Sequence, residues 1–381
     1  MIVRLLAVVA GLVGALAVTA PAAAHGADAP DATNYRTAVT SVTPPLAGLS
    51  VRTIEAGARL ELANRTGRTI EVLGYAGEPY LQVRPDGVFE NVNSPATYRN
   101  ATLAGDTAPP ATADPAKAPD WQRVSSEPVA RWHDQRTHWL AVEPPAQVWD
   151  DPGRPHRVRD WVVPLRADTT AVEVHGTLDW LPPPDPYVWW AGIALGVLAV
   201  GALGLIPPGW PGGGRALAGL AVLTALGGLA AVGYAVAREW DAGADGPGAL
   251  ALGLLAGGVW PLLVGLAALA AAGYALARRP AADFALALAG TCLALFAGLP
   301  AAALLARSVA PTPGPAVVAR SAVAAVIVVG FGVAAAGALR MRVAARTAAA
   351  RTNPVDHGAG VGDITPENPG NRAPQVHDRE R

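Results

Sequence analysis

The stretch YVWWAGIALGVLAVGALGLI, residues 187–206, contains twenty consecutive positions without a charged side chain. A run of about 20 apolar residues is long enough for a helix to cross the hydrocarbon of a bilayer. Pro182-Pro183-Pro184 stands shortly before it, and because proline fixes φ and favours extended geometry, these residues form a stiff spacer. The stretch therefore marks the boundary between two differently built parts of the chain.

Four further apolar runs follow this boundary. Each is close to or longer than the roughly 20 residues that a membrane-crossing helix needs. The third run is long and contains Pro261, so we expect it to tilt or kink. The sequence predicts a five-helix transmembrane bundle over 185–339, with spans at about 187–206, 215–236, 250–276, 283–305 and 317–339.

The interiors of these spans hold almost no ionisable groups, and their mildly polar candidates are Thr291 and Cys292. Transporters and pumps place ionisable or coordinating groups in mid-membrane, because a moving ion needs replacement ligands there. The composition therefore favours a bundle that anchors an outer domain. Small-residue spacings, Gly192 with Gly196 and Gly253 with Gly257, allow close helix contact and leave an oligomer open.

Charged residues in the loops predict the orientation of the bundle. Arginines such as Arg278 and Arg340 fall on one side of the predicted membrane, and Glu239 and Asp241 fall on the other. Arginine and lysine are enriched in cytoplasmic loops, so the arginine side is expected to be cytoplasmic. The polar residues 340–381 are then expected to be a disordered cytoplasmic tail.

The N-terminal 24 residues match a secretory signal peptide, which predicts an outer location for the domain that follows. Arg4 precedes the apolar stretch 5–18, and Ala22-Ala23-Ala24 supplies the small residues of a cleavage site. Cleavage after Ala24 would leave His25 at the mature N-terminus, although a cut two residues earlier is an alternative. The sequence thus predicts a multi-pass protein of the plasma membrane, with its N-terminal domain outside.

Residues 25–184 have the pattern of an immunoglobulin-like β-sandwich. In Leu60-Glu61-Leu62 apolar and charged residues alternate, as expected when one sheet face is buried and the other is wet. Residues 104–120 have too little apolar content to pack and are expected to be a flexible insertion. We expect strands at about 49–54, 58–63, 68–73, 79–83, 136–143, 160–166 and 170–180.

Composition excludes several classes of function. The chain is 51% hydrophobic and 15% charged with a net charge of -1, which gives no case for a nucleic-acid partner. Its single cysteine, Cys292, excludes a disulfide within the chain. The bias toward Ala, Gly, Pro and Arg is typical of GC-rich genomes, which we interpret as bacterial and actinobacterial.

One segment carries residues suited to metal chemistry: RWHDQRTHW, residues 131–139. If Asp134 to Thr137 formed a hairpin turn, His133 and His138 would be opposed cross-strand neighbours, with Cβ atoms about 5 Å apart. Two imidazoles at that spacing can converge on one metal ion, with Asp134 as a further ligand. The alternative interpretation is that these histidines are hydrogen-bonded residues of the domain without a metal.

A histidine at a free N-terminus adds a second possibility, because its amine and ring nitrogen can bind the same ion. Together with another imidazole, His25 would form a T-shaped nitrogen site suited to Cu(II). This arrangement resembles the histidine brace, and the order of an exported N-terminal His domain followed by helices is similar to the CopC and CopD copper-handling fusions. The resemblance implies a copper site at His25, His133 and His138, although the predicted outer domain has no methionine.

Motifs for catalysis are missing from residues 25–184: the sequence has no G-x-S-x-G, HExxH or phosphate-binding loop there. We therefore expect no enzyme. The leading hypothesis is a membrane-anchored, non-catalytic binding or sensing module of the cell envelope, with a protein or other partner outside the membrane. The alternative is a copper(II)-binding protein of copper homeostasis that uses His25 and a His-x4-His hairpin.

Overall fold

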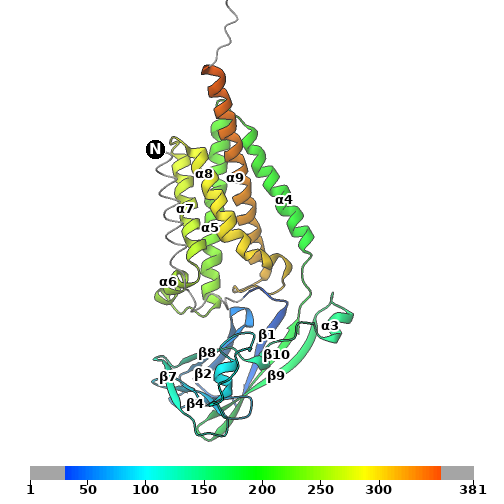
Figure 1. Cartoon of the computed structure of the whole chain (residues 1–381), viewed down its shortest axis with the longest axis vertical. Coiled ribbons are helices and arrows are strands. Elements are labelled where there is room, and N and C mark those ends of the chain that lie inside the picture. Colours follow the sequence, from blue (N-terminus) through cyan, green and yellow to red (C-terminus); the bar gives the residue numbers. More distant parts are fainter. Residues whose placement is uncertain (1–30, 353–381) are drawn as a thin grey trace, which may run out of the picture.

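The computed structural model of the chain describes residues 31–352. Within this range, an antiparallel β-region of ten strands in two sheets is followed by five apolar helices long enough to cross a membrane. The strands lie at one end of the helical bundle (Figure 1). The predicted order of a β-sandwich and a transmembrane bundle is therefore confirmed. The predicted signal peptide and His25 lie outside the described residues.

The larger sheet has the strand order β1-β10-β9-β4-β5-β6-β7, and all its neighbouring strands are antiparallel. Its longest pair is the hairpin β9–β10, whose turn holds Asp168 at a φ of 53°. Aspartate tolerates this left-handed region better than most residues. The strands are β1 (Tyr35–Thr43), β4 (Ile70–Leu73), β5 (Pro79–Arg84), β6 (Gly87–Asn91), β7 (Trp121–Ser125), β9 (His156–Ala167) and β10 (Thr170–Trp180).

The smaller sheet consists of β2 (Leu49–Ile54), β3 (Arg59–Asn64) and β8 (Val129–Trp132), with β3 in the middle. Leu60 and Leu62 of β3 are buried in an apolar cluster that also contains residues of the larger sheet. Glu61, on the opposite face, accepts hydrogen bonds from Arg52 Nε at 2.6 Å and Arg131 Nε at 2.7 Å. Apolar and charged residues therefore alternate between the two faces of β3, with a cross-strand arginine on each side of the glutamate. The expected wet face is wrong, because Glu61 is only 5% exposed.

The expected strand at 136–143 is wrong. The described chain has instead the short 3-10 helix η2 (Gln135–Thr137), followed by irregular backbone up to α3 (Ala146–Asp150). Asp134 precedes η2, and its side chain accepts a hydrogen bond from the backbone N–H of Arg136, as an N-cap residue does. This cap starts a turn of helix where the hairpin was expected. The segment between α2 (Pro95–Arg99) and β7 contains no helix or strand in the described structure. This segment includes residues 104–120, the expected insertion.

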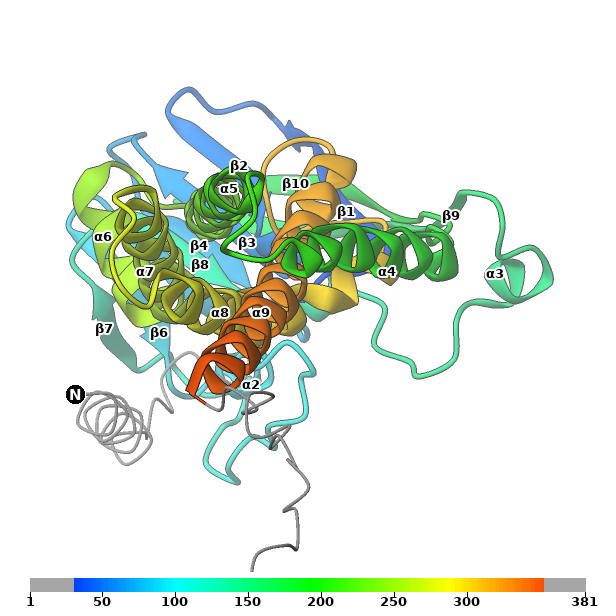
Figure 2. The same cartoon turned by 90° about the horizontal axis from the view of Figure 1, so that it is seen from above.

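The five long apolar helices agree with the expected spans in number and order. Seen from above, α9 lies against α4, α5 and α8 (Figure 2). Glycines permit its close approach to the fourth span: a Cβ at Gly330 would lie 2.7 Å from the backbone nitrogen of Ala294. The membrane half consists of α4 (Pro186–Ala202), η3 (Leu203–Leu205), α5 (Gly213–Asp241), α6 (Pro247–Ala256), α7 (Val259–Leu276), α8 (Ala282–Leu293), η4 (Ala294–Gly298), η5 (Leu299–Ala306) and α9 (Ala316–Thr352).

The third span begins later than expected and is not one helix over 250–276. The short helix α6 ends at Ala256, and α7 begins at Val259 after Gly257 and Gly258. Glycine weakens a helix interior by about 0.5–1 kcal/mol relative to alanine, so this pair provides a natural break. Pro261 is the third residue of α7, where its missing N–H has no partner within the helix to lose, so no kink is needed.

The fifth helix continues beyond its expected end and corrects the boundary of the tail. Residues 340–352, which were expected to be disordered, belong to α9. Arg340 is only 2% exposed; its Nε donates to Asp283 Oδ1 at 2.6 Å and its Nη1 donates to Ile206 O at 2.9 Å. A buried guanidinium with these partners ties α9 to α8 and to the end of the first span, which extends the helix past the apolar run.

Candidate functional site

His133 and His138 lie close together after β8, but a turn of 3-10 helix, and not a hairpin, connects them. Both rings lie near the carbonyl of Ala58, at the start of β3. Trp132 ends β8, and η2 separates the two histidines. The expected hairpin is therefore wrong, since its second strand is missing from the described backbone, although the histidines are neighbours in space.

His133 is held by hydrogen bonds through both ring nitrogens. It is 2% exposed, its Nδ1 lies 2.8 Å from Ala58 O, and its Nε2 lies 3.1 Å from Arg59 Nε. Because Arg59 can only donate, Nε2 accepts and Nδ1 carries the proton. A metal would have to displace at least one of these bonds, so the environment of His133 favours a structural role.

Asp134 is similarly occupied. Its carboxylate is fully buried and accepts from Trp132 Nε1 at 3.1 Å and from Arg136 Nη2 at 2.7 Å, both on Oδ2. The other oxygen, Oδ1, accepts from Arg136 Nε at 2.8 Å. Both oxygens thus serve a bidentate guanidinium pair, the strong form of charge-assisted hydrogen bond. The carboxylate stabilises the turn, and any metal would compete with Arg136 for it.

His138 differs from both, because its Nε2 is shielded from solvent and has no hydrogen-bond partner in the described structure. Burial, together with the neighbouring His133, lowers the pKa of His138 to about 4, so the ring is neutral near pH 7. The ring lines a small cavity of about 130 Å³ with Tyr35, Thr37 and Glu55. A neutral imidazole with a free nitrogen is the form that ligates metals.

The metal set expected from the sequence is thus brought together only in part. Within residues 31–352, no group of three or more His, Cys, Asp or Glu side chains is placed to hold a metal ion. His25 lies outside this range, but Asp31, six residues later, lines the same small cavity as His138. Of the three histidines proposed as ligands, His138 is the one whose described surroundings leave a nitrogen available.

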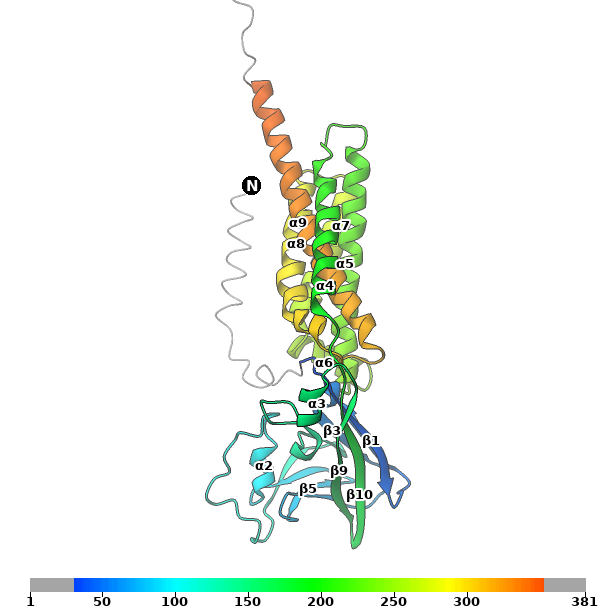
Figure 3. The same ribbon diagram turned by 90° about the vertical axis from the view of Figure 1, so that its right-hand side faces the viewer.

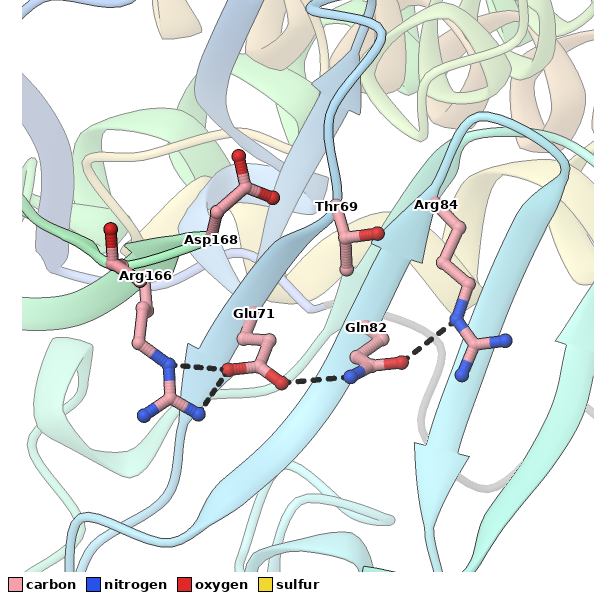
Figure 4. A pocket seen from close by; sticks show the side chains of 7 residues that line it. Thr69, Glu71, Gln82, Arg84, Arg166 and Asp168 are labelled. Atoms are coloured by element: carbon pink, nitrogen blue, oxygen red, sulfur yellow. Dashed lines mark hydrogen bonds and ion pairs between the residues drawn. The ribbon is translucent and has the colours of Figure 1, made fainter.

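A second polar cluster lies on the outer face of the larger sheet, where a row of side chains crosses β9, β4 and β5 (Figure 4). Arg166 Nε donates to Glu71 Oε2 at 2.6 Å, and Gln82 Nε2 donates to Glu71 Oε1 at 2.7 Å. Arg84 Nε then donates to Gln82 Oε1 at 2.8 Å. The groove above the row is open to solvent. Glu71 bonds cross-strand to Arg166 and Gln82, and Arg84 bonds Gln82 within β5, so the row stabilises the sheet.

The β-sandwich is attached to the bundle at two places. At the first, Ala56 N in η1 (Glu55–Gly57) donates to Asp241 Oδ2 at 2.7 Å, and Arg131 Nη2 donates to Gly243 O at 2.6 Å. Gly243 has a φ of 85°, and a Cβ there would lie 2.6 Å from Glu61 Oε2. The turn between α5 and α6 therefore fits closely against the smaller sheet, and only glycine suits this position.

The second attachment joins the start of the sandwich to the segment between the fourth and fifth spans. Thr33 and Val309 exchange two backbone hydrogen bonds, at 3.1 and 2.8 Å. Asn34 Oδ1 accepts from Ser308 N at 3.0 Å. Figure 3 shows the sandwich beneath the bundle. With two attachments far apart in sequence, the sandwich is fixed to the bundle as well as tethered by its linker.

A cavity of about 660 Å³ lies at this junction, a size typical of small-molecule sites. Both parts of the protein contribute to its wall: Glu55 and Arg59 come from the sandwich, and Arg238 and Glu239 come from α5. Its apolar wall includes Trp260 and Phe296, whose rings stack at 5.4 Å. The remaining lining residues are Asp31, Tyr234, Ala235, Ala242, Leu252, Gly253, Ala256, Gly257, Gly258, Pro261, Ala297, Pro300, Ala301 and Pro311.

The sequence identified Glu239 only as a loop charge that helps to orient the bundle, and gave no reason to select Arg59 or Phe296. These three residues come from three separate segments, β3, α5 and η4, and their meeting depends on how the sandwich sits on the bundle. Comparisons of the chain with protein-family models, with characterised proteins and with solved structures produced no match. The cavity is therefore interpreted from its own chemistry.

Proposed function

We propose that this chain is a membrane-anchored, non-catalytic binding or sensing module of the cell envelope, and that its ligand binds in the junction cavity. The single observation that carries this proposal is the shared wall of the cavity, with Glu55 and Arg59 on one side and Arg238 and Glu239 on the other. A ligand there would contact sandwich and bundle together. Its binding free energy could then shift the arrangement of the two parts, which is the requirement for sensing.

The orientation belongs to the same proposal. The signal-peptide pattern and the arginine bias of the loops both favour an outer location for the sandwich and an inner location for the end of α9. The junction cavity would then lie at the outer surface of the plasma membrane, reachable from the envelope. No catalytic step is proposed, because the charged groups of the cavity support recognition without a nucleophile paired to a base.

Hydrogen–deuterium exchange of the full chain in nanodiscs tests the proposal. An extract of envelope lipids and small molecules is expected to slow exchange both at 54–59 in the sandwich and at 239–246 in the α5–α6 turn. Slowing at both places follows because one ligand bridges the two walls. Unchanged exchange at both segments, or slowing confined to the bundle, would contradict a shared site.

A second candidate function is copper(II) binding, which the free Nε2 of His138 favours. Nothing within the described residues supplies three ligands, so this candidate depends on the N-terminal amine and ring of His25 reaching the small cavity. The full mature chain should then bind Cu(II), with a large loss of affinity in His138→Phe. The matched control is His175→Gln, on the partly exposed face of β10. Equal affinity in wild type and His138→Phe would exclude this candidate.

A further inference from the structure

We infer that the junction cavity binds the headgroup of an aminophospholipid of the phosphatidylethanolamine type, whose ammonium group pairs with Glu239. This inference rests on the proposed function and adds the chemical class of the ligand. It is carried by three features of the cavity: an unengaged carboxylate, guanidinium groups beside it, and an apolar wall that continues to the surface of the bundle.

Glu239 supplies the carboxylate. In the described structure its side chain accepts no hydrogen bond and forms no ion pair, and its electrostatic neighbour is Arg238. The carboxylate lies over the backbone of α6, where a Cβ at Gly253 would come within 2.0 Å of Oε2. The glycine thus leaves room for a charged group in a partly apolar setting. The carboxylate has Arg238 nearby but no hydrogen-bonded cation in the described structure, and a primary ammonium would supply both a charge and three donors.

Two arginines of the cavity are suited to the phosphate, which is the negatively charged group of the headgroup. Arg238 and Arg59 both line the cavity, and guanidinium groups match phosphate geometry well. Phosphate and ammonium in phosphoethanolamine are separated by two carbons, so one headgroup can face neighbouring basic and acidic side chains. A purely anionic headgroup such as phosphoglycerol would bring no positive charge of its own to the carboxylates of the cavity, Glu239, Glu55 and Asp31.

The apolar wall explains why the ligand is a lipid. Leu252 is 71% exposed, Trp260 40% and Phe296 37%, and all three line the cavity. Leu252 belongs to α6, Trp260 to the start of α7 and Phe296 to η4. Of these elements, α6 lies at the end of the bundle nearest the sandwich (Figures 1 and 3). Tryptophan favours the headgroup level of a bilayer. Acyl chains could therefore extend along these helices in the hydrocarbon while the headgroup occupies the cavity.

Native mass spectrometry of the full chain tests this inference. Synthetic phosphatidylethanolamine and phosphatidylglycerol with identical acyl chains are added in equal amounts. We expect the ethanolamine lipid to be retained at least about tenfold better, the effect of one charge-assisted hydrogen bond. Glu239→Gln should remove this preference. Equal retention of the two lipids by wild type, or an unchanged preference in Glu239→Gln, would overturn the inference.

Two glycine variants form a matched pair. Gly253→Ala should reduce retention of the ethanolamine lipid because its Cβ would displace the carboxylate. Gly257→Ala should retain it, since a Cβ there lies 3.7 Å from Glu239 Oε1, an ordinary contact. Equal effects of the two would count against the inference. If the envelope extract still slowed exchange at both walls while the ethanolamine lipid showed no preference, the junction site would stand and its ligand class would be wrong.

Discussion

His133, Asp134 and His138 are close in sequence but differ in what their atoms have left to bind. Hydrogen bonds engage both nitrogens of His133 and both oxygens of Asp134, whereas Nε2 of His138 has no partner in the described structure. The sequence singled out this segment because it clusters histidines and tryptophans. It could not show that both nitrogens of His133 are engaged, since the partners Ala58 and Arg59 lie about 75 positions earlier.

Protonation of His138 should make the stability of the sandwich depend on pH. Burial lowers its folded pKa from 6.5 to about 4, so between these values the unfolded chain binds a proton that the folded chain does not. Stability should therefore fall as pH drops below about 6.5, and the loss should reach at most about 3.5 kcal/mol below pH 4, at about 1.4 kcal/mol per pKa unit. Urea unfolding of the full chain at pH 4, 5.5 and 7, followed by tryptophan fluorescence, measures it.

Replacing the ring isolates this contribution from the carboxylates that also titrate in acid. His138→Phe should lose less stability than wild type between pH 7 and pH 4, while His175→Gln should behave as wild type. A pH dependence that is the same in wild type and His138→Phe would show that the buried ring is not its source.

At the scale of the element, glycines that look equivalent in sequence have different surroundings. Gly192 and Gly196 share a spacing typical of helix contacts, yet a Cβ at Gly192 meets nothing within 4 Å, whereas one at Gly196 lies 2.8 Å from Val328. Gly253 and Gly257 face the carboxylate of Glu239. Hydropathy predicted the number of helices well, because bilayer thickness fixes their length. It could not say which glycines lie at contacts, since that depends on the rotation of each helix.

Packing of α8 against α9 should depend on Gly290. A Cβ there would lie 2.6 Å from Gly330 O, a backbone atom that cannot move aside. Gly290→Leu is therefore expected to destabilise the bundle by about 2 kcal/mol or more, as overpacking does. The melting temperature of the full chain in detergent measures this, with Gly192→Leu as the control that should leave it unchanged. A similar fall in both variants would mean that the α8–α9 contact is not the cause.

For the whole molecule, orientation can be tested with cysteines in a Cys292→Ser background. Ser126→Cys places a thiol on the sandwich, and Thr347→Cys places one near the end of α9; both positions are exposed. A membrane-impermeant maleimide should label Ser126→Cys in intact protoplasts and Thr347→Cys only after lysis. The reverse pattern would place the sandwich in the cytoplasm and remove the proposed role in the envelope.

The sequence predicted two parts joined by a spacer, and both parts are present. It did not predict the attachments between them, because contacts such as Ala56 to Asp241 and Thr33 to Val309 join residues nearly 200 or more positions apart. No local pattern reports such pairings. The junction cavity, which is the candidate site, depends on these attachments, so it could not be recognised from either part alone.

The central claim is that sandwich and bundle form one unit around the junction. Double electron–electron resonance between spin labels at Glu173→Cys in β10 and Ala270→Cys in α7, with Cys292→Ser, tests it most directly. We predict a single narrow distance distribution in the otherwise unaltered chain, and a broader one when Asp241→Ala and Arg131→Ala remove the first attachment. A broad distribution before those changes would show a sandwich that moves freely on its linker, and would contradict the claim.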